Sequence, residues 1–158
     1  MQATIEGDFP SQTDVGAAEG RDEANVRAVY AEFMNAWNRG SGDDLASVFD
    51  EDGDLVAFDG THFTGRSAIA EFHQELFDRW LKGSRLVGSV TAVRFLATDV
   101  ALMHALGSTV MPGKSKASPE RDSIQTLVVV RGAEGWKLAA FQNTRLRQMG
   151  QRFLAFLT

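Results

Sequence analysis

Two stretches in the C-terminal half of the chain decide the fold. Residues 86–111 read LVGSVTAVRFLATDVALMHALGSTVM, and residues 124–146 read IQTLVVVRGAEGWKLAAFQNTRL. Each is rich in β-branched and aromatic residues and is divided by a short turn sequence, Thr98-Asp99 in the first and residues 132–135 in the second. The pattern predicts four antiparallel strands, joined as two hairpins, over residues 86–96, 100–111, 124–130 and 136–146.

Two helices are predicted upstream, and the first has Asp22 as its N-cap and ends at Gly40. Its apolar side chains recur at i, i+3, i+4, i+7 and i+11, and they are Val26, Val29, Tyr30, Phe33 and Trp37. A short second helix begins near residue 43, where two acidic residues suit the positive end of a helix. Its inward side chains are Leu45, Val48 and Phe49.

A third helix is predicted from Gly65 onward, with Thr64 as its cap. Its apolar stripe is formed by Ile69, Phe72, Leu76 and Trp80, with His73 inside it. A small hairpin, with its turn at Asp59-Gly60, precedes this helix. Three helices packed on one face of a bent antiparallel sheet define an α+β fold.

The length of 158 residues fits one domain. Residues 1–20 are polar and aperiodic and predict a disordered arm, residues 21–147 form the domain, and residues 148–158 form a C-terminal tail. No run of residues has the composition of a membrane span or a signal peptide, which predicts a cytoplasmic protein without a membrane partner.

Charge and cysteine content exclude several classes of site. The chain has 16 basic and 21 acidic residues, a net charge of −5, and no basic block, which argues against nucleic-acid binding. It has no cysteine, and hence no disulfide and no thiolate nucleophile. No GxGxxG motif follows a strand, and the three histidines lack metal-ligand spacing, so we expect neither a cofactor nor a metal.

Three segments resemble a known family. They are residues 53–69, with GDLV and GTHFTGRSAI; residues 93–104, with VRFL and DVALMH; and residues 127–144, with LVVVR and WKLAAFQNT. These segments and the order of elements resemble the SgcJ/EcaC family of the nuclear-transport-factor-2-like superfamily, which includes ketosteroid isomerase and SnoaL-type polyketide cyclases. The resemblance covers residues 22 to about 147.

The resemblance implies a cone-shaped domain whose concave sheet and first and third helices enclose a pocket. It also implies a homodimer that forms through the outer face of the sheet, where we expect Phe141. Some members accompany polyketide and enediyne biosynthesis, which makes polyketide synthases candidate partners. The oxidoreductase label used in this family has no support, because no nucleotide motif is present.

Ketosteroid isomerase chemistry needs a carboxylate base and a phenol donor. The resemblance places the base position at Ala57 and the phenol position at Phe33, so both groups are missing. Asp59 and Tyr30 form a displaced base-and-phenol pair, although an aspartate before glycine is also typical of a simple turn. His73 is either a packed core histidine or a pocket acid/base, and its apolar neighbours should lower its pKa.

Alternation along the strands predicts which polar side chains face the pocket. His104 shares a face with Val100 and Leu102, and this face is either concave or convex. On the last strand, Gln142 shares a face with Trp136, and we expect that face to be the concave one. The arginines at positions 66, 121 and 145 are expected to form structural ion pairs.

The sequence therefore predicts a protein that binds a hydrophobic polyketide or enediyne-type intermediate, without establishing a catalysed reaction. The predicted wall and orienting contacts are Tyr30, Phe33, Trp37, Phe72, His73, Leu76, Trp80, His104 and Gln142. If the protein is an enzyme, cofactor-free isomerisation, cyclisation or dehydration fits best, with His73 or Asp59 as proton carrier. The alternative is a non-catalytic carrier, chaperone or dimerisation module of a biosynthetic complex.

Overall fold

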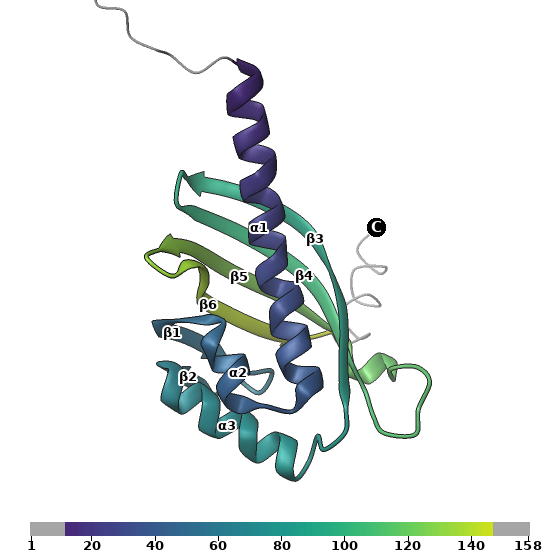
Figure 1. Ribbon diagram of the computed structural model, residues 1–158. Coiled ribbons are helices and arrows are strands. Elements are labelled where there is room, and N and C mark those ends of the chain that lie inside the picture. The colour runs from purple at the N-terminus through teal and green to yellow at the C-terminus, as the bar shows by residue number, and fades with distance from the viewer. Residues whose placement is uncertain (1–11, 147–158) are drawn as a thin grey trace, which may run out of the picture.

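The computed structural model describes residues 12–146, and side chains from Glu19 onward (Figure 1). Its helices are α1 (Gln12–Arg39), α2 (Gly42–Ser47), α3 (Arg66–Asp78) and the 3₁₀ helix η1 (Pro119–Arg121). Its strands are β1 (Phe49–Val56), β2 (His62–Thr64), β3 (Arg85–Ala97), β4 (Val100–Val110), β5 (Ser123–Gly132) and β6 (Gly135–Arg145). The predictions for residues 1–11 and for the tail 148–158 lie outside the described residues.

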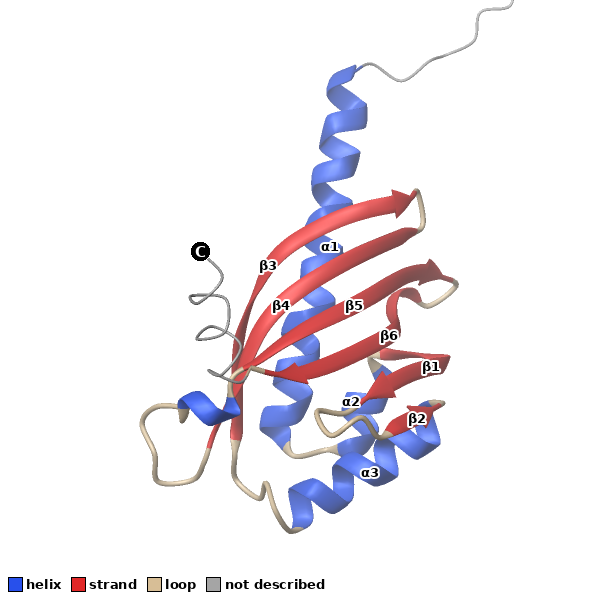
Figure 2. Ribbon diagram, turned by 180° about the vertical axis from the view of Figure 1, so that it is seen from behind, coloured by secondary structure: helices blue, strands red, loops and turns tan. Residues whose placement is uncertain are grey.

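A single six-stranded sheet has the order β2-β1-β6-β5-β4-β3, and α1 crosses its inner, concave face, which is seen from behind in Figure 2. The four long strands are antiparallel neighbours in chain order, as the two hairpin patterns predict. The prediction of a fully antiparallel sheet is wrong, however, because β1 pairs with β6 in parallel. The α+β class is confirmed, and the short β1–β2 hairpin extends the sheet beyond β6.

Helix α1 begins ten residues before Asp22, the predicted N-cap, so residues 12–20 are helical and Asp22 is not an N-cap. The Asp22 carboxylate instead pairs with Arg131 of β5, with 3.0 Å between Oδ1 and Nη1. The predicted end is correct, because Gly40 adopts φ +67°, a left-handed conformation that favours glycine. The predicted stripe is buried from Val26 to Phe33 and packs against the sheet.

The second and third helices pack on each other beside the β1–β2 hairpin (Figure 1). Ser41 caps α2, since its hydroxyl accepts the Asp44 N–H at 3.1 Å. Gly42 permits the close approach of α3, because a Cβ there would collide with the carbonyl oxygen of Ala70. Thr64 is not the cap of α3, because its hydroxyl donates to Asp54 at 2.7 Å.

The predicted inward face of α3 is partly wrong. The buried residues are Ile69, His73 and Phe77, and the helix packs on α2, β1 and β2 instead of on the four long strands. Trp80 lies beyond the end of the helix and is 75% exposed. The predicted apolar stripe assumed that the helix continues through Trp80, whereas the helix ends at Asp78.

A β-bulge in β6 changes which residues face inward. Val128 pairs with Ala140, and the next residue, Val129, pairs with Leu138, so Ala139 is the additional residue. Leu138 is buried on the inner face, and beyond the bulge Phe141 is buried there, with its ring 4.8 Å from that of Phe33. Strict alternation from Trp136 therefore fails: the expected concave position of Gln142 and the expected outer position of Phe141 are both wrong.

The alternating burial along β4 shows on which face of the sheet His104 lies. Ala101, Met103 and Ala105 of this strand are fully buried in the core beneath α1. His104 points to the opposite, convex face of the sheet. Within residues 12–146 no helix combines the length and the apolarity that crossing a bilayer requires.

Candidate ligand pocket

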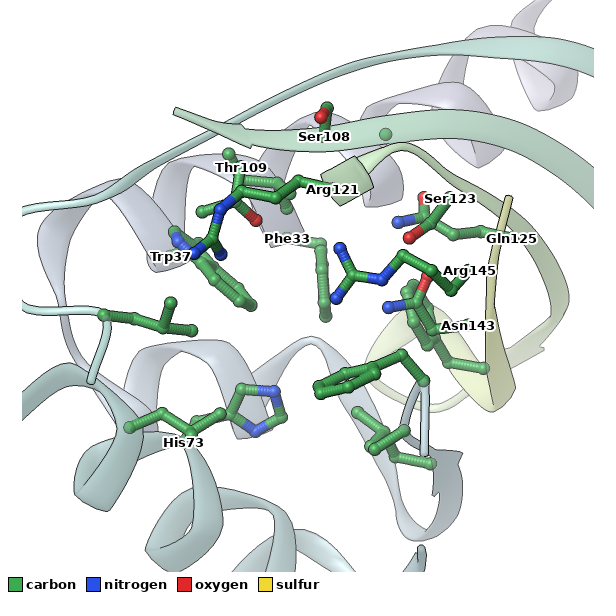
Figure 3. Close-up of a pocket in the computed structure, with 18 of the residues that line it drawn as sticks. Phe33, Trp37, His73, Ser108, Thr109, Arg121, Ser123, Gln125, Asn143 and Arg145 are labelled. Atoms are coloured by element: carbon green, nitrogen blue, oxygen red, sulfur yellow. The ribbon is translucent and has the colours of Figure 1, made fainter. Parts of the chain in front are cut away.

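A pocket of about 430 Å³ lies between α1, α3 and the inner face of the sheet (Figure 3). Of the nine residues predicted for the wall or for orienting contacts, six line it: Phe33, Trp37, Phe72, His73, Leu76 and Trp80. The two helices supply apolar side chains, and the inner face of the sheet supplies most of the polar ones. The pocket is therefore apolar on one side and polar on the other.

Neighbouring contacts fix the orientation of the apolar wall. The indole of Trp37 donates from Nε1 to the hydroxyl of Ser84 at 3.2 Å. Phe72 stacks on Phe63 of β2 with ring centroids 4.2 Å apart, which links α3 to the hairpin. These side chains are held in place before any ligand binds, which reduces the entropy lost on binding.

His73 is both a core residue and a pocket residue. Its side chain is 3% exposed and lies against the rings of Trp37, Phe72 and Phe77. Burial lowers the pKa of His73 to about 4, so the imidazole is neutral at pH 7. Nδ1 lies 2.8 Å from the carbonyl oxygen of Ile69, which can only accept, so Nδ1 carries the proton and Nε2 has the lone pair.

Tyr30 lies behind the wall and does not line the pocket. Its hydroxyl donates to Oε1 of Gln125 at 2.6 Å, and both side chains are buried. Burial raises the pKa of Tyr30 to about 12, so the phenol stays protonated. Tyr30 therefore contributes by positioning Gln125, which does line the pocket.

Three other predicted residues lie outside the pocket. Asp59 is exposed in the turn, where its carboxylate accepts the Thr61 N–H at 2.9 Å, and that hydrogen bond lowers its pKa. This is the simple turn role, and it removes Asp59 as a proton carrier in the pocket. His104 and Gln142 lie on the outer face of the sheet, for the reasons given above.

Sequence reasoning missed most of the polar side of the pocket. Ser108, Thr109, Ser123, Gln125 and Asn143 line it, at inner-face positions of β4, β5 and β6 or close to them. Two of their atoms, Oγ of Ser108 and Oδ1 of Asn143, are buried without a hydrogen-bond partner among the described residues. Alternation with buried Leu127 would have indicated Gln125 and Ser123, whereas the bulge conceals Asn143.

Two arginines also line the pocket, at positions expected to form structural ion pairs. That expectation is correct for Arg66, which pairs with Glu134 at 2.8 Å. Arg121 and Arg145 form no ion pair with any residue in the range 12–146. Arg145 stacks on the ring of Phe58 at 4.6 Å and donates to the carbonyl oxygen of Glu120 at 3.2 Å.

The pocket lacks the isomerase arrangement. No carboxylate is among the described residues that line it, and Ala57 lies there where the resemblance places the base. Phe33 occupies the phenol position. The titratable side chains that line the pocket are His73, Arg121 and Arg145, which provide a hydrogen-bond acceptor and two cations.

Comparison with solved structures supports the fold assignment. A domain of unknown function with a cystatin-like fold from Nostoc punctiforme is 41% identical, and the match covers 85% of this chain and 83% of that one with a TM-score of 0.78. An NTF2-like protein from Novosphingobium aromaticivorans is 20% identical over 87% and 92% of the two chains, with a TM-score of 0.69. A ketosteroid isomerase-like protein from Erwinia carotovora atroseptica is 14% identical over 78% and 95%, with a TM-score of 0.61.

No curated protein matches the chain. Residues 18–142 match the SnoaL-like domain, which covers most of the described range. The narrower assignment to the SgcJ/EcaC family stays a prediction. A SnoaL-like match over most of the chain, together with a 41% identical structure of the same fold, leads to one conclusion: this chain belongs to the SnoaL-like domain family and has the cystatin-like fold of the NTF2-like proteins.

Proposed function

We propose that the protein binds a largely hydrophobic small molecule with several oxygen functions, of the polyketide or enediyne-intermediate class. The observation that carries this proposal is the pocket itself, with an apolar helix wall facing a polar sheet wall. Its volume of about 430 Å³ lies in the range of pockets that hold drug-sized ligands. The class of ligand follows from the resemblance to SnoaL-type polyketide cyclases.

The buried polar atoms support a ligand with oxygen functions. Leaving a hydrogen-bonding atom buried and unpaired is unfavourable by about 1–3 kcal/mol. Ser108 and Asn143 line the pocket and each has one such atom, which a hydroxyl or carbonyl group of a ligand would satisfy once the side chain turns toward it. Nε2 of His73 adds an acceptor for a ligand hydroxyl on the α3 side.

Catalysis by His73 is the second candidate function, and the lone pair on Nε2 favours it. A neutral imidazole whose pKa is about 4 can accept a proton only weakly, and at pH 7 it carries almost none to donate. The geometry therefore supports binding better than acid–base turnover, and it favours a carrier role over an enzyme.

The binding proposal is tested with a neutral two-ring fluorophore, N-phenyl-1-naphthylamine, whose emission rises in apolar pockets. We expect saturable binding to the wild-type protein. Ala57→Leu should weaken it at least about tenfold, because the added carbons enter the pocket. Ala92→Leu makes the same change at an exposed site on β3 and should bind as wild type does. Equal binding by all three proteins would refute the proposal.

The carrier and enzyme roles are separated with a compound that co-purifies with the protein, identified by mass spectrometry. For a carrier, His73→Ala should lower affinity for that compound, and His73→Gln should restore much of it through the amide. For an enzyme, His73→Ala should abolish turnover while affinity stays within about tenfold. Unchanged binding with a lower melting temperature would make His73 a core residue only.

A further inference from the structure

Arg121 and Arg145 combine two properties, a position in the pocket wall and the absence of an ion pair within residues 12–146; Arg85 and Arg94 also lack an ion pair there, but they are exposed outside the pocket. Five other arginines of the described chain pair with carboxylates at 2.7–3.4 Å, as Arg66 does with Glu134. Arg121 and Arg145 have no such partner in residues 12–146, although both are half-buried and line the pocket. Asp122 is the acidic residue whose charge acts on Arg145, but it forms no ion pair with it.

The fold brings these two side chains to the same side of the pocket. Arg145 is the last residue of β6 and pairs across the sheet with Ser123 of β5. Arg121 ends η1, two residues before Ser123, so it reaches the same corner from the preceding turn. Both guanidinium groups point into the cavity, on the side opposite His73 (Figure 3).

We propose that Arg121 and Arg145 bind the carboxylate of the hydrophobic ligand, so that the substrate class of this pocket is a hydrophobic carboxylic acid. This inference rests on the proposed ligand-binding function. Planar guanidinium groups match the geometry of a carboxylate and form strong, short hydrogen bonds with it. Ser108 and Asn143 line the same pocket and add a hydroxyl and an amide to its polar side.

Electrostatics gives an independent reason. Burial, followed by the positive charge of Arg121, lowers the pKa of Arg145, so two cations repel each other in a partly desolvated site. A bound anion would relieve that repulsion. The whole chain has a net charge of −5, which disfavours anions in general. A preference for an anionic ligand must therefore come from this local pair.

The apolar body of the pocket argues for a carboxylate over a phosphate group. Guanidinium groups bind phosphate as well as carboxylate, but a dianionic phosphate carries more charge and hydration than a carboxylate and is often also held by backbone N–H groups at a helix N-terminus. Among the described lining residues the sheet side offers two arginines, hydroxyls and amides, and the facing wall is aromatic and aliphatic. One acidic group on a hydrophobic skeleton fits both halves.

The test compares 2-naphthoate with its neutral analogue 2-naphthamide by calorimetric titration of the full chain. The wild-type protein should bind naphthoate at least about tenfold more tightly than naphthamide. Arg121→Gln and Arg145→Gln should each remove about tenfold of the naphthoate affinity and leave naphthamide within about twofold. Arg94→Gln is the matched control, because Arg94 is exposed on β3 outside the pocket, and it should behave as wild type.

The outcomes separate this inference from the proposed function. If naphthamide and the neutral fluorophore bind but naphthoate has no advantage, the arginine proposal is wrong and the binding function stands. If 2-naphthoate, 2-naphthamide and the fluorophore all fail to bind, the binding function itself is wrong. An equal loss in Arg94→Gln would assign the preference to general charge and refute the proposal. Arg145→Lys keeps the charge, so it preserves folding and should retain part of the preference if the Gln variant unfolds.

Discussion

The protonation of His73 should make this protein sensitive to acid, and His73→Gln should remove that part of the sensitivity. In the folded chain the imidazole is buried among aromatic rings, which lowers the pKa of His73 from 6.5 to about 4. In the unfolded chain the ring is hydrated and has its ordinary pKa of about 6.5. Between these two values the unfolded state binds the proton and the folded state does not.

The sign and size of the effect follow from that difference. Because the unfolded state binds more protons between pH 6.5 and 4, the free energy of unfolding falls as the pH falls through this window. Each pKa unit corresponds to about 1.4 kcal/mol, so His73 accounts for a loss of about 3 kcal/mol by pH 4. Above pH 6.5 its contribution is constant. A loss of this size is a substantial fraction of the stability of a typical domain.

Urea unfolding of the wild-type protein and of His73→Gln, at pH values from 7.5 to 4, would measure the effect. Three carboxyl groups also have lowered pKa values, and their protonation destabilises the folded protein in acid: Asp54, Asp59 and Glu134. All three are present in both proteins. The difference between the two curves therefore isolates His73. From pH 7 to pH 4 the free energy of unfolding of the wild-type protein should fall by about 3 kcal/mol more than that of His73→Gln.

His104→Gln is the matched control, since His104 lies on the convex face of the sheet and its imidazole forms no hydrogen bond or ion pair within residues 12–146. Its curve should stay parallel to that of the wild-type protein. Parallel curves for His73→Gln and the wild-type protein would refute the reasoning. A magnetic-resonance titration of His73 with a midpoint near 6.5 would do so as well.

Three further predictions concern packing and assembly. Tyr30→Phe leaves the buried Gln125 oxygen without its donor and should lower the free energy of unfolding by about 1–3 kcal/mol in urea titrations; an unchanged value would contradict the buried hydrogen bond. Gly42→Ala forces a methyl group into a backbone carbonyl of α3 and should lower the free energy of unfolding by about 2 kcal/mol or more, measured in thermal melts. Gly132→Ala is the control, because Gly132 has open space around it, and its melting curve should be nearly unchanged. We expect a homodimer formed through the outer face of the sheet, where Leu106 is 43% exposed, and Leu106→Lys should give a monomer mass in light scattering; a monomeric wild-type protein at micromolar concentration would count against it.

Elements with a strong local pattern could be predicted from the sequence. The four long strands match their predicted ranges closely because turn residues mark both hairpins. The core stripe of α1 was correct because it packs on the sheet at a helical spacing. The first turns of α1 extend beyond the sheet in Figure 1, and residues 12–20 have no periodic apolar pattern in the sequence, so the helix start at Gln12 was missed.

The candidate site was predictable on its helix side and much less so on its sheet side. Phe33, Trp37 and Phe72 line the pocket as helical spacing indicated. Arg121 and Arg145 were missed because surface ion pairing is the ordinary role of an arginine, and only the arrangement in space shows that these two have no carboxylate partner. Long-range geometry of this kind leaves no trace in local sequence.

The bulge at Ala139 separates the recognition surface of β6 from residue counting along the strand. Inward positions are even-numbered before the bulge, as at Leu138, and odd-numbered after it, at Phe141, Asn143 and Arg145. Ala140 pairs with Val128 and Phe141 with Leu127, and Ala139 takes no part in either pair. Deleting Ala139 should therefore remove the bulge and leave all three later side chains facing the pocket. At this point of the fold, a change of one residue in chain length can be absorbed without altering which side chains a ligand meets.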